Sequence, residues 1–233
     1  MTATLSVVIP MLDEASTLPA CLAAVAAQEG WPGKVELLAV DGGSTDDSRV
    51  VAEAAGAQVL EAPRGRGVQM RAGAEAAAGD VLMFLHADVR LPDGAFAAVA
   101  AALEQPGTVA GCYELEHEHG PDAGPITRFG LWLADWRSRT RRIPYGDQAI
   151  WCTTAAYRAV GGMPERPLME DVAFAHALKR HGHLARLPLT VRTGARRFER
   201  APIHTTVCWW SFPLLARLGV PPRTLARWYG RGC

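Results

Sequence analysis

The chain has 233 residues, with 24 basic side chains, 24 acidic side chains and a formal net charge of zero. Because 49% of the residues are hydrophobic, the chain can bury a substantial core, which excludes a largely disordered protein. The charges are unevenly placed: residues 1–125 hold 6 basic and 18 acidic side chains, and residues 126–233 hold 18 and 6. A total of zero argues against a nucleic-acid-binding protein, whose cationic charge would show in the sum. The two parts, at −12 and +12, are expected to have different electrostatic roles.

The N-terminus and the cysteines bear on location. Residues 1–10 contain an apolar run without basic residues before it, and Asp13 and Glu14 follow, which is unlike a signal peptide. No stretch reaches the roughly 18 uninterrupted apolar residues that a membrane-spanning helix needs. The cysteines are scattered and form no C-x-x-C pair, which disfavours a disulfide framework or a zinc site. They are Cys21, Cys112, Cys152, Cys208 and Cys233. We therefore predict a cytoplasmic protein with reduced thiols.

The first hundred residues alternate between strand and helix patterns. Short apolar runs predict strands, and apolar residues three and four positions apart predict helices. The predicted strands are residues 5–10, 35–40, 58–60 and 81–85, and the predicted helices are residues 15–28, 46–55, 67–78 and 95–103. Strands separated by helices of this length form right-handed crossovers. The sequence therefore predicts an α/β fold with a mostly parallel sheet and helices on both faces.

From residue 109 onward the pattern is less regular. The predicted strands are residues 109–118 and 149–152, and the predicted helices are residues 125–142, 154–160 and 171–181. The tail from residue 203 is rich in Trp and Leu and contains three prolines. Because no repeat or linker interrupts the chain, we predict a single domain with a helical C-terminal extension.

Carboxylates follow three of the predicted strands. In an open parallel sheet, ligands bind beyond the carboxyl ends of the strands. Asp13 and Glu14 follow the first strand, Asp41 follows the second, and His86 and Asp88 follow the fourth. Such a cluster binds a cation or accepts hydrogen bonds from a polar ligand, because like charges left alone would repel. A purely structural role in a turn or loop is the alternative for each of these residues.

Several motifs, in this order and spacing, resemble glycosyltransferase family 2 on a GT-A fold. They are SVVIP at 6–10 with Asp13 and Glu14, VDGGSTDDS at 40–48, GDVLMFLHAD at 79–88, GGM at 161–163, and Glu170 and Asp171 opening a helix that reaches Arg180. The resemblance covers about residues 5–190. The runs FLHAD at 84–88, YGDQ at 145–148 and ARRFER at 195–200 are similar to a bacterial subgroup often described as linked to arsenosugar biosynthesis.

The resemblance implies a site for a sugar nucleotide and a divalent metal. The residues implied for the nucleoside pocket are Pro10, Glu14, Asp41 and Ala87. Asp88 would hold Mn²⁺ or Mg²⁺ on the diphosphate of the donor. The family usually carries an Asp-x-Asp metal motif, but His86 stands at its first position here. An imidazole ligand favours a transition metal such as Mn²⁺.

Glu170 and Asp171 stand at the start of a predicted helix. Breaking the bond between a sugar carbon and a diphosphate requires charge neutralisation on the leaving group and a base for the incoming hydroxyl. The resemblance implies that Asp171 is this base, with Glu170 as its nearest competitor. The alternative is that both acids merely stabilise the helix dipole.

Arg66 lies in the segment RGRG at 64–67, just before a helix. Its guanidinium and the backbone N–H groups suit a phosphate. The segment is not a dinucleotide fingerprint, because Met70 occupies the position of the third glycine. A solvated loop is the alternative interpretation for Arg66.

The basic part of the chain holds the acceptor candidates. Tyr145, Asp147 and Gln148 offer hydrogen-bonding groups, and Arg197 belongs to a cluster with two further arginines at 196 and 200. With the aromatic residues at 209–212, this cluster suits an anionic membrane surface or a phosphorylated acceptor. The alternative is that the aromatic stripe belongs to the core or to a dimer contact.

We predict a metal-dependent, inverting glycosyltransferase that moves a sugar from a UDP- or GDP-sugar to a small-molecule or lipid-linked acceptor. Within a domain of residues 1–200, residues 1–125 would bind the donor and residues 126–200 the acceptor. Residues 201–233 would form a helical tail that contacts the inner membrane peripherally or forms a homodimer.

Two alternatives come from other classes of protein. A nucleotidyltransferase would need a Gly-rich, basic loop directly after the first strand, where this chain has MLDE at 11–14. The other is a non-catalytic, membrane-associated nucleotide-binding protein.

Overall fold

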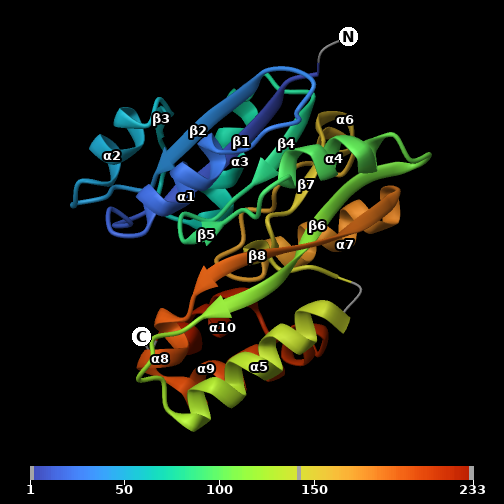
Figure 1. Ribbon diagram of the computed structural model, residues 1–233. Helices are drawn as coiled ribbons and strands as arrows, with labels where there is room; N and C mark the ends of the chain where they lie inside the picture. The colour runs from blue at the N-terminus through green and yellow to red at the C-terminus, as the bar shows by residue number, and fades with distance from the viewer. Residues whose placement is uncertain (1–2, 141–142, 231–233) are drawn as a thin grey trace.

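The computed structural model describes residues 3–140 and 143–230, and it contains one curved eight-stranded sheet flanked by helices (Figure 1). Cys233, the last two residues of the predicted helix at 125–142 and the end of the predicted tail at 201–233 lie outside the described residues.

The sheet is mixed, with the order β3-β2-β1-β4-β7-β6-β8-β5. The strands are β1 (Leu5–Met11), β2 (Val35–Asp41), β3 (Gln58–Glu61), β4 (Val81–Phe84), β5 (Val89–Arg90), β6 (Thr108–Glu118), β7 (Trp151–Thr153) and β8 (His183–Gly194). Parallel pairs join β3 to β2, β2 to β1 and β1 to β4, as the alternation of strands and helices predicts. Beyond β4 the sheet changes: β7 is antiparallel to both β4 and β6, β8 is parallel to β6, and β5 is antiparallel to β8.

Helices cover both faces of the sheet, which confirms the predicted α/β class. They are α1 (Leu18–Ala26), α2 (Ser48–Ala54), α3 (Arg66–Ala76), α4 (Ala95–Leu103), α5 (Pro125–Thr140), the 3₁₀ turn η1 (Gly146–Gln148), α6 (Thr154–Ala159), α7 (Glu170–His181), α8 (Arg196–Arg200), α9 (Pro202–Arg217) and α10 (Pro222–Gly230). The alternation along β1 separates two cores, because successive side chains point to opposite faces. Leu5, Val7 and Ile9 pack with α1 and α4, and Val8 packs with α3 and α7.

The sequence analysis did not identify β8, and Pro188 within it explains why. A proline inside a run argues against a strand, because it lacks the N–H that the ladder needs. In the structure, Tyr113 of β6 pairs with Leu187 and the next residue, Glu114, pairs with Thr190, so Pro188 falls at a β-bulge. The bulge lets β8 continue through the proline.

Helices α5, α8, α9 and α10 form a separate layer at the far ends of the long strands β6 and β8 (Figure 1). Two small apolar clusters hold this layer together. One joins Leu131 of α5 to Phe198 of α8 and Trp209 of α9, and the other joins Phe212 of α9 to Leu225 of α10. No helix among the described residues is long and apolar enough to cross a membrane.

Candidate functional site

A cavity of about 670 Å³ lies between the sheet and the helical layer. Pro10 at the end of β1 and the loop after β4 form one side, as expected for the carboxyl ends of parallel strands. The start of α7 and residues of α8, α9 and α10 form the other sides. Segments from the acidic part of the chain, residues 1–125, and from the basic part, residues 126–233, therefore line the same cavity.

The structure brings eleven of the thirteen predicted site residues to the wall of this cavity. They are Pro10, Glu14, Arg66, His86, Ala87, Asp88, Tyr145, Asp147, Glu170, Asp171 and Arg197. Asp41 and Gln148 are not among the described residues that line it.

Asp41 and Gln148 instead hold backbone in place. The carboxylate of Asp41 is buried and accepts hydrogen bonds from the backbone N–H of Ser44 at 3.0 Å and from the Ser44 hydroxyl at 2.5 Å. The side-chain amide of Gln148 donates to the carbonyl oxygen of Tyr113 at 2.8 Å and accepts from the N–H of Tyr145 at 3.1 Å. These contacts favour a structural role, so ligand binding by the two residues stays a prediction.

Two carboxylates and one arginine meet where the loops after β1 and β4 approach α8. Nη2 of Arg196 lies 2.7 Å from Oε2 of Glu14 and 3.6 Å from Oδ2 of Asp88. Burial raises the pKa of Asp88, and the charge of Glu14 raises it further. Arg196 therefore acts as the cation that this carboxylate pair needs. The sequence places Arg196 in a cluster expected at an anionic membrane surface or a phosphorylated acceptor, and in the structure Arg196 lines the cavity beside Glu14 and Asp88.

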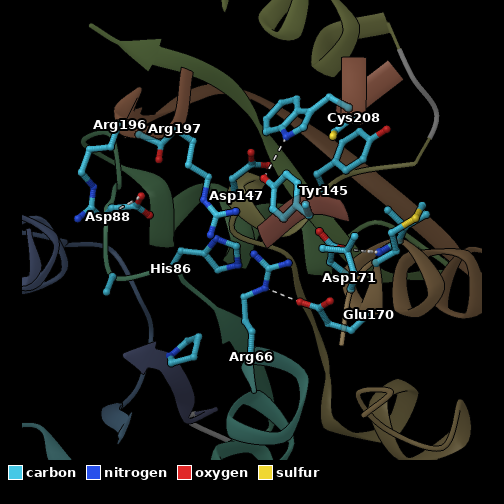
Figure 2. A pocket seen from close by; sticks show the side chains of 18 of the residues that line it. Arg66, His86, Asp88, Tyr145, Asp147, Glu170, Asp171, Arg196, Arg197 and Cys208 are labelled. Atoms are coloured by element: carbon cyan, nitrogen blue, oxygen red, sulfur yellow. Dashed lines mark hydrogen bonds and ion pairs between the residues drawn. The ribbon is translucent and has the colours of Figure 1, made fainter. Parts of the chain in front are cut away.

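His86 is held as a neutral imidazole inside the cavity wall. Burial lowers its pKa well below the ordinary value, and the charges of Arg66 and Arg197 lower it further. Both arginines point toward His86 in Figure 2. Its Nε2 is buried without a hydrogen-bond partner among the described residues. A Cβ built on Gly146 would come within 2.8 Å of this atom, so His86 packs closely against the η1 backbone.

Glu170 and Asp171 differ in their partners. Glu170 is almost fully buried and forms an ion pair with Nε of Arg66, so its charge is already matched. Oδ2 of Asp171 accepts a hydrogen bond from the N–H of Gly146 at 2.6 Å, and Oδ1 accepts from Val172 N–H at 2.7 Å. Asp171 lines the cavity with a carboxylate that the backbone orients.

Met169, directly before this pair, adopts the left-handed conformation with φ of 61°. The other non-glycine residues with positive φ among the described ones are Asp13, after β1, and Ala149, after η1. L-residues pay a steric penalty in this conformation, which persists where the surrounding structure requires it. All three segments border the cavity, which is consistent with a functional site.

Asp147 of η1 is a second unusual carboxylate in the cavity. Its Oδ1 is buried and lacks a hydrogen-bond partner within the part of the chain that the structure describes. Burial raises its pKa to about 6, against the opposing influence of His117. His117, which also lines the cavity, has its Nδ1 2.6 Å from Oδ1 of Asp135 on α5. Sequence analysis missed this His117–Asp135 pair, although the alternation of β6 places His117 on the buried side.

Aromatic rings and arginines form the wall opposite the sheet. The guanidinium of Arg137 lies 4.7 Å from the ring centroid of Tyr145 and 5.1 Å from that of Trp209. The guanidinium of Arg197 lies 4.6 Å from the ring centroid of Tyr229 on α10. These distances are those of cation–π contacts. The side chain of Arg197 points into the cavity (Figure 2), and its predicted role at an anionic membrane surface or a phosphorylated acceptor stays a prediction.

Asp88 and Glu14 bring two carboxylates together at the sheet end of the cavity, where Arg196 contacts both. No group of three or more His, Cys, Asp or Glu side chains within residues 3–140 and 143–230 is arranged to hold a metal ion. Mg²⁺ commonly binds proteins through one or two carboxylates and takes its other ligands from substrate phosphates and water. The hard oxygens of Asp88 fit an ion that arrives with a diphosphate.

Comparisons with known proteins identify relatives of this chain. An uncharacterized glycosyltransferase of Mycobacterium tuberculosis is 35% identical to this chain over 150 residues, which cover 62% of this chain and 64% of that protein. The matched region thus spans less than two thirds of the relative.

Two solved structures share the fold. S. aureus TarS 1–349 in complex with UDP-GlcNAc has a TM-score of 0.63 and 16% identity, covering 82% of this chain and 58% of that chain. Glucosyl-3-phosphoglycerate synthase from M. tuberculosis, in complex with Mg²⁺ and UDP, has a TM-score of 0.58 and 20% identity, covering 81% and 70%. Both support the predicted GT-A-like fold. Residues 6–160 match the family model described as glycosyl transferase family 2, and the chain belongs to this family.

Proposed function

We propose that this protein is a metal-dependent, inverting glycosyltransferase that uses a UDP- or GDP-sugar. One observation carries the proposal: Asp88 after β4 and Asp171 on α7 line the same cavity, on opposite sides of His86 (Figure 2). An inverting displacement needs a leaving group and a base on opposite faces of the reacting sugar carbon. Membership of the family and the nucleotide complexes of the two structural neighbours support this assignment.

Residues 1–125 would bind the donor. Pro10, Glu14 and Ala87 line the end of the cavity at the sheet, where a nucleoside would lie. Asp88 would hold the divalent metal, which, when bound, neutralises charge on the departing diphosphate. Arg66 borders the same cavity at the start of α3 and would add a second positive charge near that diphosphate.

Asp171 would take the proton of the acceptor hydroxyl. The Gly146 N–H fixes one oxygen of its carboxylate at 2.6 Å, which orients the group toward the cavity. Glu170 is the weaker candidate because its carboxylate is paired with Arg66. An oriented carboxylate that accepts a proton from a nucleophile is general base catalysis.

Residues 126–200 would receive the acceptor, with residues of α9 and α10 completing the cavity. Tyr145, Asp147 and Arg197 line its helical side, together with Trp209 and Arg137. Arginines and stacked aromatic rings suit an anionic group attached to a sugar or lipid. A cytoplasmic location stays a prediction, and the relatives described above do not test the resemblance to the subgroup linked to arsenosugar biosynthesis.

The test is incubation of the whole chain with separate UDP- and GDP-sugars, in Mn²⁺, in Mg²⁺ and in chelator, with nucleotide release as the readout. We expect slow, metal-dependent release of UDP or GDP from a preferred donor, because water can replace the acceptor. Release of pyrophosphate from a nucleoside triphosphate would instead identify a nucleotidyltransferase. Nucleotide binding without any turnover, even in the presence of acceptor mixtures, would contradict the enzyme and leave a nucleotide-binding protein.

A further inference from the structure

Helix α5 is apolar on two opposite faces. Its buried face, which includes Leu131 and Ala134, packs toward β6 and α8. The opposite face carries large apolar side chains with exposed fractions between 50% and 62%. They are Ile126, Phe129, Trp132 and Trp136. Their spacing of three and four residues places them in one stripe along the helix. A helix that only covered a core would be polar on this outer side.

Helix α9 repeats the pattern. Its buried residues include Cys208 and Phe212, which line the cavity. The opposite face exposes a second apolar stripe, with exposed fractions between 38% and 64%. The stripe consists of Ile203, Val207, Trp210 and Leu214. Spacings of four, three and four residues again define a single face.

The two stripes look to the same side of the molecule. Gly130 of α5 lies against Thr206 of α9, and Arg137, further along α5, donates a hydrogen bond to the carbonyl oxygen of Trp209. The two helices therefore run side by side in the same direction, and both also contact α8 (Figure 1). Because the buried faces share α8, the exposed stripes point away from it. We call these eight side chains the outer apolar surface.

Positive charge surrounds the outer apolar surface. Helices α5, α8, α9 and α10 carry nine arginines, and their acidic residues, within the described bounds, are Asp135 and Glu199. Asp135 lies 2.6 Å from His117, and Glu199 accepts a hydrogen bond from the Gly120 N–H, so both carboxylates are engaged. Arg128 on α5 and Arg217 on α9 are exposed beside the two stripes.

We propose that the outer apolar surface docks on an anionic lipid bilayer, with α5 and α9 lying in the plane of the membrane interface. Tryptophan favours the level of the lipid headgroups, and arginine places its chain along apolar surface while its charge reaches the phosphates. Helices with an apolar face and arginines at its edge bind anionic membranes in this orientation.

The charge distribution favours lipid over a second copy of this chain. Two copies joined through this surface would bring arginine-rich helices together, with few carboxylates between them to offset the repulsion. An anionic bilayer supplies the missing negative charge.

Docking would also place the cavity close to the membrane. Cys208 and Phe212, on the inner face of α9, line the cavity, whereas Val207 and Trp210, on its outer face, would touch lipid. One helix diameter, about 10 Å, separates the two faces. A lipid-linked acceptor would then reach the cavity without leaving the bilayer. This consequence rests on the proposed function. The docking of the outer apolar surface on a membrane does not depend on the proposed function.

The test is sedimentation of the whole chain with vesicles of phosphatidylcholine, with or without phosphatidylglycerol. We expect binding to the phosphatidylglycerol vesicles, weakening as salt rises. The double variant Trp132→Ser, Trp136→Ser should bind at least about tenfold more weakly, since each tryptophan buries a large apolar area. Serine and tryptophan have similar helix propensities, so α5 should stay folded. Circular dichroism and nucleotide binding check this point.

Val50→Ser is the matched control, because Val50 is an equally exposed apolar residue on α2, outside the helical layer. This variant should bind vesicles like the unchanged protein. Equal binding to both kinds of vesicle, no binding to either, or full binding by the double tryptophan variant would overturn the proposal. So would light scattering that shows a dimer which the double variant converts to a monomer. None of these outcomes depends on transferase activity.

Discussion

The sheet region and the helical layer reach the same cavity by different routes. Strands β1 to β4 and helices α1 to α4 are close in sequence, and their parallel pairs bring the loops that follow them to one edge. Helices α5 and α8 to α10 reach that edge from distant parts of the chain: Arg196 bonds Glu14 across 182 positions. The topology of the sheet thus determines where its site residues lie. In the helical layer, the positions of the site residues depend on tertiary contacts between distant parts of the chain.

The two regions also differ in charge and in their outer faces. The sheet region contributes the carboxylates of Glu14 and Asp88, and the layer contributes arginines and aromatic rings. The layer also exposes large apolar side chains, including Trp132 and Trp136. We infer that the sheet region serves the donor and the layer serves the acceptor, and each variant below tests one side of this division.

The largest effect is expected for Asp171→Asn, on the side of the acceptor. The amide keeps the size of the side chain but cannot accept the proton of the acceptor hydroxyl, so transfer should fall by about 10²- to 10⁴-fold. The measurement is the rate of sugar transfer at saturating donor. Donor affinity should stay nearly unchanged. Full turnover in this variant would remove Asp171 as the base and return Glu170 to consideration.

Asp88→Ala tests the donor side. Loss of the carboxylate should weaken metal-dependent binding of the nucleotide by more than about 100-fold, since even outer-shell partners of a metal contribute about 10- to 100-fold. Calorimetry of UDP and GDP with Mn²⁺, Mg²⁺ or chelator measures the effect. The affinity in chelator is the internal control and should change little. Unaltered metal-dependent binding would show that other groups hold the ion.

Most of the sheet region could be predicted from the sequence. The runs that became β1, β2 and β4 are apolar and end at polar residues, which identifies the strands and, after β1 and β4, the loops that border the cavity. The expected meeting of Glu14 and Asp88 follows from parallel pairing alone, and both residues line the cavity. In the case of Asp41, the same reasoning gave the position but not the orientation, because its carboxylate turns back to Ser44.

The helical layer was harder to predict for physical reasons. Periodicity identifies an apolar face but not its partner, and α5 and α9 have two such faces each. The proline in β8 concealed a strand that a bulge accommodates. The His117–Asp135 pair joins a strand to a helix, so neither local pattern could reveal it.

The acceptor side should show a pH effect centred on Asp147. Its pKa of about 6 in the folded state lies above the ordinary value, so the folded protein holds the proton more tightly than the unfolded chain. Stability should therefore fall as pH rises from about 4 to 7. Asp147→Asn removes the buried charge and should raise the free energy of unfolding by about 3 kcal/mol at pH 8, since one pKa unit corresponds to about 1.4 kcal/mol. Urea unfolding at pH 4 and at pH 8 measures the difference, which should disappear at pH 4. Asp93→Asn, the same substitution at an exposed position, is the control variant.

The smallest effect concerns Arg196, which links the two regions. Arg196→Gln removes the cation between Glu14 and Asp88, and the carboxylates then repel each other. Because Arg196 is partly exposed, water screens these ion pairs, and the loss of stability should be no more than about 1 kcal/mol. The freed carboxylates should bind Mn²⁺ several-fold more tightly in the absence of nucleotide.

Calorimetry with Mn²⁺ alone tests whether Arg196 competes with the metal for the two carboxylates or has a purely structural role. Arg49→Gln removes the exposed ion pair with Glu61 on the sheet region, away from the cavity, and should leave Mn²⁺ affinity unchanged. If Arg196→Gln binds Mn²⁺ no better than this control, Arg196 does not compete for the carboxylates. Arg196 would then join the two regions only through its ion pairs, and metal binding at this end of the cavity would depend on residues of the sheet region.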